Sequence, residues 1–189
     1  MALITDIHTH HMKASAYPFV LNAYPEQADL VRQHPDLLFS VGMHPWNLHL
    51  YNPIELPLNT LVALSTLPQV VMIGECGLDK NAQSPLSLQQ EIFHRHIEIS
   101  ENLQKPLLVH CVGCFDKLIA ARKPATQRWI IHGFRGKPQL AQQLLQHGMD
   151  ISFGPQFNIQ SVLLTPPERL HVETDDTEAI RPLVRVRLR

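Results

Sequence analysis

Short apolar runs alternate with longer amphipathic segments along most of this chain. Eight of these runs are four or five residues long and rich in Val, Ile, Leu and Phe, a pattern that indicates short buried β-strands. The predicted strands cover Leu3–Asp6, Phe19–Asn22, Leu38–Gly42, Val70–Gly74, Leu107–His110, Trp129–His132, Met149–Ser152 and Leu170–Glu173.

The segments between the strands have helical periodicity. The clearest places Leu88, Ile92, His96, Ile99 and Leu103 on one face, at spacings of three and four residues. Another helix is bracketed by Pro138 in its first turn and Gly148 just past its end. The predicted helices cover Pro25–His34, Leu58–Leu67, Ser87–Gln104, Phe115–Arg122 and Pro138–His147.

Strands that alternate with helices predict parallel β-α-β units, and eight of them favour a (β/α)₈ barrel, an α/β fold. The chain has 189 residues, fewer than the ~250 typical of this barrel. We therefore expect the first and last helices to be abbreviated or missing. A short segment separates the first two strands, and fourteen residues follow Asp175. Residues 1–189 are expected to form a single domain.

Composition narrows the class of protein. The chain is 44% hydrophobic and 17% charged, as in soluble globular proteins, and no apolar run approaches the ~20 residues of a transmembrane helix. The N-terminus lacks the basic and long apolar regions of a signal peptide, so we expect a cytoplasmic location. The three cysteines are then expected to be reduced, and the single C-x-x-C at Cys111 and Cys114 indicates a metal or redox role only weakly.

The net charge of −1 argues against bulk non-specific attraction to nucleic acid. Charge is distributed unevenly, however. The last nine residues contain four arginines and no acid, a tail that could contact phosphate or simply be solvated. It also contains four apolar residues that could cover the barrel's flank or a second subunit, namely Leu183, Val184, Val186 and Leu188.

Candidate chemistry begins with Asp6-Ile7-His8-Thr9-His10. Residues two apart in a strand point to the same face, so Asp6, His8 and His10 are expected to aim one way. Two imidazoles and a carboxylate are ligands that suit Zn²⁺ or Mn²⁺.

Further ligand-type residues end other apolar runs. Glu75, His110, His132 and Asp175 each follow or close a predicted strand. A (β/α)₈ barrel projects its functional groups from the C-terminal ends of its strands, at one mouth. The pattern therefore predicts a metal site in an enzyme.

Several motifs, in this order along the chain, resemble the TatD-type metal-dependent hydrolases of the amidohydrolase superfamily. Gln89 and Phe93 of the long predicted helix also match. The motifs are Asp6–His10, Val41–Pro45, Ile73–Asp79, Pro106–His110, His132–Gly136, Ile151–Gly154 and Glu173–Asp175.

The resemblance implies a (β/α)₈ hydrolase that cleaves phosphodiester bonds, typically as a DNase, with two divalent metal ions. Transferred residue by residue, His8, His10, Glu75 and Asp175 hold one ion, and Glu75, His110 and His132 hold the second. Two such ions can clamp the attacking and leaving oxygens of a phosphodiester, and a carboxylate can bridge them where an imidazole cannot. The residue types leave the metal open among Zn²⁺, Mn²⁺ and Mg²⁺.

Four further assignments complete the predicted site. Asp175 is expected to orient or deprotonate the attacking water, with Glu75 as its catalytic partner at the metals. Asp79 is expected to fix the orientation of a ligand. His44 and Arg135 are candidates to contact the substrate phosphate.

The chain departs from the family pattern after His110, where Cys111-Val112 replaces the usual Ser-Arg and removes a cation. Two alternatives to a nucleic acid or phosphodiester substrate stay open. One is a hydrolase of C–N, ester or lactone bonds on the same barrel, although many of these bridge their metals with a modified lysine where this chain has Glu75. The other is a metal-binding module without turnover. Oligomeric state is left undetermined.

Overall fold

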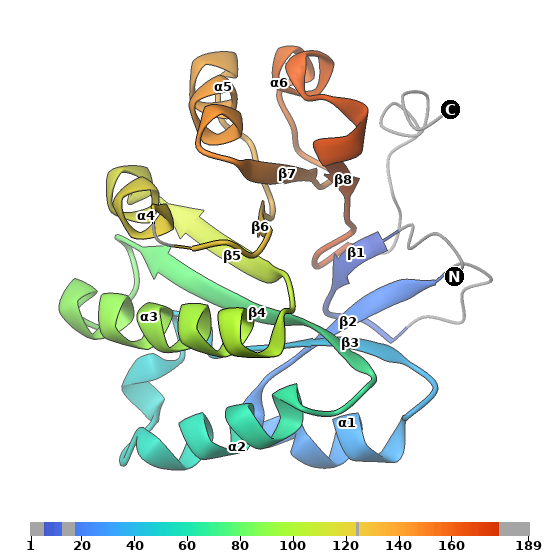
Figure 1. Ribbon diagram of the computed structural model, residues 1–189, viewed down its shortest axis with the longest axis vertical. Helices are drawn as coiled ribbons and strands as arrows, with labels where there is room; N and C mark the ends of the chain where they lie inside the picture. The colour runs from blue at the N-terminus through green and yellow to red at the C-terminus, as the bar shows by residue number, and fades with distance from the viewer. Residues whose placement is uncertain (1–5, 13–17, 124, 178–189) are drawn as a thin grey trace.

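The computed structural model describes residues 6–12, 18–123 and 125–177 (Figure 1). Its eight strands form one parallel sheet, in which the strands follow one another in chain order. They are β1 (Asp6–Thr9), β2 (Phe19–Ala23), β3 (Leu38–Val41), β4 (Val70–Asp79), β5 (Leu107–Val112), β6 (Trp129–Ile131), β7 (Met149–Phe153) and β8 (Leu170–Val172).

The sheet closes on itself where β1 meets the chain that follows β8. Thr9 and Asp175 form a parallel bridge. The Asp175 N–H donates to the carbonyl of His8 at 3.0 Å, and the His10 N–H donates to the carbonyl of Asp175 at 3.2 Å. The predicted (β/α)₈ barrel is therefore confirmed.

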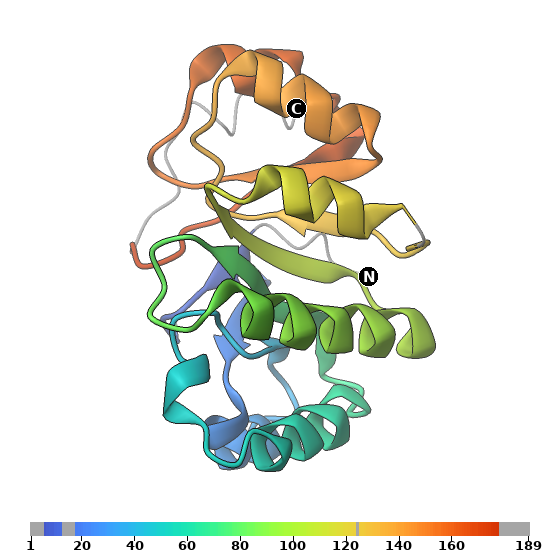
Figure 2. The same cartoon turned by 90° about the vertical axis from the view of Figure 1, so that its left-hand side faces the viewer.

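Helices cover the outside of the barrel. In Figure 1, α1 and α2 lie below the sheet, α3 and α4 to its left, and α5 and α6 above it. Figure 2 shows α3 and α4 side by side. The helices are α1 (Ala28–Gln33), α2 (Glu55–Ser65), α3 (Leu86–Leu103), α4 (Phe115–Arg122), α5 (Pro138–Gln146) and α6 (Ile159–Leu164), with short 3₁₀ turns η1 (Pro25–Gln27), η2 (Leu48–Leu50) and η3 (Pro167–Arg169).

Alternation along the strands creates an inner and an outer apolar layer. Leu107 and Val109 of β5 belong to the cluster that packs under the helices, whereas Leu108 belongs to a separate cluster with Ile7, Val20, Met72 and Ile130 from four other strands. Because His110 lies two residues after Leu108, it shares the inner face. The interior of the barrel is thus apolar below and polar at the C-terminal mouth.

Most predicted elements are confirmed, and the main differences are at β1, β4, α2 and α6. β1 covers Asp6–Thr9 and so continues past the predicted end at Asp6, which places His8 within the strand and His10 directly after it. β4 continues past the predicted end at Gly74 to Asp79. α2 begins at Glu55, three residues early, and α6 is a helix that the pattern did not predict.

The expectation of an abbreviated first helix agrees with the described residues between β1 and β2, 10–12 and 18, which contain none. Residues 3–5, 13–17 and the arginine-rich tail at 181–189 lie outside the described part of the chain. None of the helices within that part is long and apolar enough to cross a membrane.

Candidate metal centre

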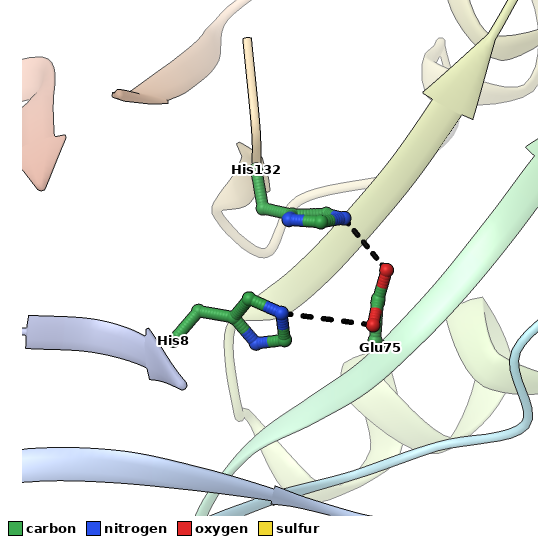
Figure 3. Close-up of side chains that lie close together, drawn as sticks. All are labelled: His8, Glu75 and His132. Carbon is green, nitrogen blue, oxygen red and sulfur yellow. Dashed lines mark ion pairs between the residues drawn. The ribbon is translucent and has the colours of Figure 1, made fainter. Parts of the chain in front are cut away.

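The predicted ligands come together at the C-terminal mouth of the barrel. His8 from β1, Glu75 from β4 and His132 from the end of β6 point toward one another (Figure 3). His10, His110 and Asp175 belong to neighbouring clusters of His, Glu and Asp side chains that could hold a metal ion. The structure therefore brings together all six residues that the sequence nominated as metal ligands.

Glu75 lies at the centre, and its two carboxylate oxygens face different sets of histidines. Oε2 lies 3.6 Å from His8 Nε2 and 3.5 Å from His10 Nε2. Oε1 lies 3.1 Å from His110 Nδ1 and 2.6 Å from His132 Nε2. The two oxygens of Glu75 thus face different pairs of histidines.

Asp175 completes the Oε2 side. Its Oδ1 lies 3.6 Å from His8 Nε2 and 3.5 Å from His10 Nε2. The backbone of Asp175 has φ +53°, a left-handed conformation that costs a non-glycine residue energy and that its bridge to Thr9 helps to hold.

The environment of His8 indicates whether these residues fit a metal ion. The side chain of His8 is 0% exposed, and neither ring nitrogen has a hydrogen-bond partner among the described residues. A buried imidazole without a partner is costly. The two 3.6 Å separations around Nε2 are long for hydrogen bonds, yet they are close to the ~3.4 Å between two ligand atoms that each lie ~2.1 Å from one tetrahedral ion. The donor set therefore fits a divalent cation.

Electrostatics at the centre also favours a cation. Burial raises the pKa of Glu75, but the positive charge of His132 and hydrogen bonds from His10, His110 and His132 outweigh it, so the pKa lies well below its usual value. Burial lowers the pKa of His132, but Glu75 and Glu173 outweigh it and raise the pKa well above the ordinary value. A metal ion would replace this proton as the charge that stabilises Glu75.

Asp79 contacts His110, one of the predicted metal ligands. Its Oδ2 accepts a hydrogen bond from His110 Nε2 at 3.0 Å, so a neutral His110 ring would offer its Nδ1 lone pair, on the side of Glu75, to a metal ion. The end of β4 that carries Asp79 is fixed by Gln89 of α3, whose Oε1 accepts the Asp79 N–H at 2.8 Å. The matched glutamine of the long helix thus has a defined structural role.

Glu173 and Asn22 are contributors to which the sequence assigned no role. Glu173 Oε1 accepts the Gly133 N–H and lies 3.4 Å from His132 Nδ1. Asn22 Oδ1 accepts the backbone N–H of Glu75 at 3.0 Å. Glu173 is part of the quoted Glu-Thr-Asp motif, but nothing in the sequence shows which imidazole it faces.

Asp6 and His44 have contacts that the sequence did not indicate. Among the described residues, no cluster of side chains that could hold a metal ion contains Asp6 together with His8 and His10. The Asp6 oxygens accept hydrogen bonds from the Thr174 N–H at 3.1 Å and the Thr174 hydroxyl at 2.7 Å, which tie β1 to the end of β8. His44, nominated for substrate, lies at the centre itself, with Nε2 3.1 Å from Glu75 Oε1. Burial lowers the pKa of His44, which favours a neutral ring there.

A cavity of about 500 Å³ opens beside the centre. His110, His132 and Asp175 line it, and the exposed Arg135 lies at its margin. No salt bridge joins Arg135 to a carboxylate among the described residues, so its guanidinium is available to a ligand. Cys111 also lines this cavity, and all three cysteines are free.

This is a closed parallel (β/α)₈ barrel with a histidine- and carboxylate-rich centre at the C-terminal mouth. A profile of the family described as TatD related DNase matches residues 6–183. The chain therefore belongs to the TatD related DNase family.

Named relatives agree with this assignment. The "3'-5' ssDNA/RNA exonuclease TatD" of Citrobacter rodentium is 31% identical over 166 residues, which is 79% of this chain and 61% of the relative. An "uncharacterized metal-dependent hydrolase" of Buchnera aphidicola is 29% identical over 161 residues, 77% of this chain and 61% of the relative. The matched part of the chain thus spans only about 61% of the length of these relatives.

Solved structures show the same fold. The crystal structure of YJJV, a TatD homologue from Escherichia coli K12, superposes with a TM-score of 0.79 at 20% identity and covers 98% of this chain and 88% of its own. A TatD family hydrolase from Entamoeba histolytica gives a TM-score of 0.73 at 20% identity, covering 92% and 74%.

Proposed function

We propose that this protein is a metal-dependent hydrolase that cleaves phosphodiester bonds in nucleic acid, as a deoxyribonuclease of the TatD type. One observation carries the proposal: the carboxylate of Glu75 presents one oxygen to His8 and His10 and the other to His110 and His132. Such a bridge suits a pair of ions that act on one phosphodiester. The names of the relatives support the choice of nucleic acid as substrate.

In this proposal, His8, His10, Glu75 and Asp175 would hold one ion, and Glu75, His110 and His132 would hold the second. When bound, the ions would lower the pKa of water and stabilise the charge that develops on the phosphate oxygens. The Glu75 side chain is buried and flanked on both sides by imidazoles, so its position is fixed before substrate arrives.

Asp175 would orient or deprotonate the attacking water. It lines the cavity and is partly exposed, whereas Glu75 is buried. Burial raises the pKa of Asp175, but the nearby ring of His8 and the charge of His132 lower it below its ordinary value, which keeps the carboxylate ionised. An ionised carboxylate beside the cavity can accept a proton.

Substrate phosphate would lie between the centre and Arg135 at the margin of the cavity. His44 would hold Glu75 through Oε1 and contact the same phosphate, and Asp79 would keep His110 oriented. For the rest, the proposal retains what the sequence predicts: a single domain over residues 1–189, a cytoplasmic location, and Zn²⁺, Mn²⁺ or Mg²⁺ as the metal.

The test is Mn²⁺-dependent cleavage of end-labelled single-stranded DNA by the wild type and by Glu75→Ala. We expect EDTA to abolish cleavage and Mn²⁺ to restore it. Glu75→Ala should lower the rate by ~10³-fold or more, because both ions lose a ligand. Isothermal titration with Mn²⁺ should show two sites in the wild type and weaker binding in the variant.

Glu168→Gln is the matched control, since Glu168 is exposed in η3, away from the centre. It should retain wild-type cleavage. Cleavage that persists in Glu75→Ala would overturn the proposed centre. Tight Mn²⁺ binding without cleavage of any nucleic acid would overturn the nuclease function and favour a small ester or amide as substrate.

A further inference from the structure

The cavity beside the centre has two chemically different sides. His110, His132 and Asp175 line the side next to Glu75, whereas Val112, Phe115 and Phe134 line an apolar wall. A volume of about 500 Å³ lies within the ~300–1,000 Å³ typical of small-molecule sites. The proposed metal ligands account for the polar side of the cavity, but they do not explain why its other wall is apolar.

Trp46 lies at the margin of this cavity, with its side chain largely in solvent. The residue is 56% exposed. The other tryptophan, Trp129, is 0% exposed and packs against Phe93 in the core. Core packing therefore explains Trp129 but not Trp46.

Hydrogen bonds hold Trp46 in a fixed position although it is exposed. The indole Nε1–H donates to Asp79 Oδ2 at 2.7 Å, and the backbone N–H donates to His44 Nδ1 at 3.1 Å. The ring packs edge to face with His44 and His110, at centroid distances of 5.0 and 5.9 Å. An exposed aromatic ring that is held by the groups around the metal centre is preorganised for contact with a ligand.

The charges around the cavity indicate which of its two sides would hold a nucleobase and which a phosphate. Arg135 is the only lysine or arginine among the described residues that line the cavity, and Asp175 and Asp176 are also part of the lining. An apolar wall with an exposed indole suits a neutral planar group, because aromatic side chains stack on every nucleobase. The histidine-rich side suits the phosphate.

We propose that Trp46, with the apolar wall of Val112, Phe115 and Phe134, forms a subsite that stacks the base next to the scissile phosphate. The inference rests on the proposed function, since it places the phosphate at the metal centre. A paired base is stacked within its duplex and would have to leave it to reach Trp46. The subsite therefore favours single-stranded ends over duplex.

Binding can be tested without cleavage through tryptophan fluorescence. The protein is titrated in EDTA with deoxyadenosine 5′-monophosphate and, separately, with 2-deoxyribose 5-phosphate, which has the same sugar and phosphate but no base. We expect the nucleotide to quench the fluorescence and the sugar phosphate to leave it unchanged. Trp46→Phe retains buried Trp129 as an internal reference, and its fluorescence should not respond to either compound.

Cleavage provides the second readout. Single-stranded oligonucleotides that end in a normal or an abasic nucleotide are compared for wild type, Trp46→Ala and Trp46→Phe. For the normal end, Trp46→Ala should raise KM about 10-fold, a loss within the range for one stacked base. Trp46→Phe, which keeps a ring but loses the indole N–H, should have a smaller effect. For the abasic end, all three proteins should have similar KM values.

Leu50→Ala is the control for the loss of an exposed apolar side chain on the same connection, and it should match the wild type. Equal quenching by the two titrants would overturn the subsite. So would a fall in kcat that is the same for both oligonucleotides, because Trp46 would then act only through Asp79 and His110. Base-dependent quenching in a protein that does not cleave DNA would support the subsite and overturn the proposed function instead.

Discussion

Glu173 shows how one residue can act through another at this centre. Its side chain is fully buried, and its Oε1 faces both the Gly133 N–H and His132 Nδ1. A carboxylate on one nitrogen of an imidazole fixes the tautomer and leaves the lone pair of the other nitrogen free. In His132 that other nitrogen is Nε2, which lies 2.6 Å from Glu75.

We expect Glu173→Gln to weaken metal binding at the Oε1 side of Glu75 by ~10–100-fold, the usual effect of removing such a partner. The amide preserves the volume and can still accept the Gly133 N–H, so the fold should persist. Titration calorimetry with Mn²⁺ measures the affinity, and circular dichroism checks the fold. Wild-type affinity in a folded variant would show that Glu173 does not orient His132.

The sequence identified some residues of the centre and gave no role to others. His8, His10, Glu75, His110, His132 and Asp175 were found because each ends a recognisable apolar run, and their roles as ligands stay predictions. Glu173 and Trp46 were not assigned roles, because their partners come from distant strands. Substrate contact by His44 stays a prediction, and only the fold shows that its ring also lies against Glu75.

At the scale of elements, the differences arise where function interrupts the hydrophobic pattern. In β4, apolar residues give way to Glu75, Gly77 and Asp79, so the pattern predicts an end at Gly74, whereas the ladder with β5 continues to the pair of Asp79 and Val112. α6 is only six residues long, too short to show periodicity. The long α3, with several turns of amphipathic pattern, was predicted to within one residue.

Gly77 shows how closely β4 and β5 approach. It has φ +144°, and a Cβ there would lie 2.0 Å from the carbonyl oxygen of His110. We expect Gly77→Ala to lower the free energy of unfolding by about 3 kcal/mol or more, from strained backbone plus overpacking against β5. Urea denaturation measures the change.

Gly148 is the matched control for this substitution. It also has positive φ, +76°, but a Cβ there would meet only Arg122 Nη2, at an ordinary 3.6 Å. Gly148→Ala should lower the free energy of unfolding by ~1 kcal/mol, because it strains the backbone without overpacking a neighbour. Equal costs for the two substitutions would show that β5 shifts to make room without loss.

At the scale of the whole molecule, His96 couples stability to pH. It is fully buried in α3, where Nε2 accepts the Met43 N–H at 2.9 Å and so fixes the connection that carries His44. Burial lowers its pKa to about 4, against a hydrogen bond to the Ile92 carbonyl that raises it. The unfolded chain, with a pKa of about 6.5, binds this proton first.

The neutral, buried His96 therefore contributes its full stabilisation above pH ~6.5. This stabilisation, on the order of 3 kcal/mol in total, is lost as the pH falls toward 4. His96→Gln, which can replace both hydrogen bonds, should be less stable at neutral pH but show a shallower decline between these values. The measurement is urea denaturation at several pH values in EDTA. Parallel declines for the two proteins would show that His96 does not titrate in this window.

The closure of the barrel also determines when the centre can exist. The bridge that joins β1 to the chain after β8 links Thr9 with Asp175, residues 166 positions apart. During synthesis, His8 and His10 leave the ribosome early, but Asp175, which would complete their proposed ligand set, arrives only after all eight strands. A nascent chain therefore contains these histidines without the assembled site, and any nuclease activity would begin only once the barrel closes.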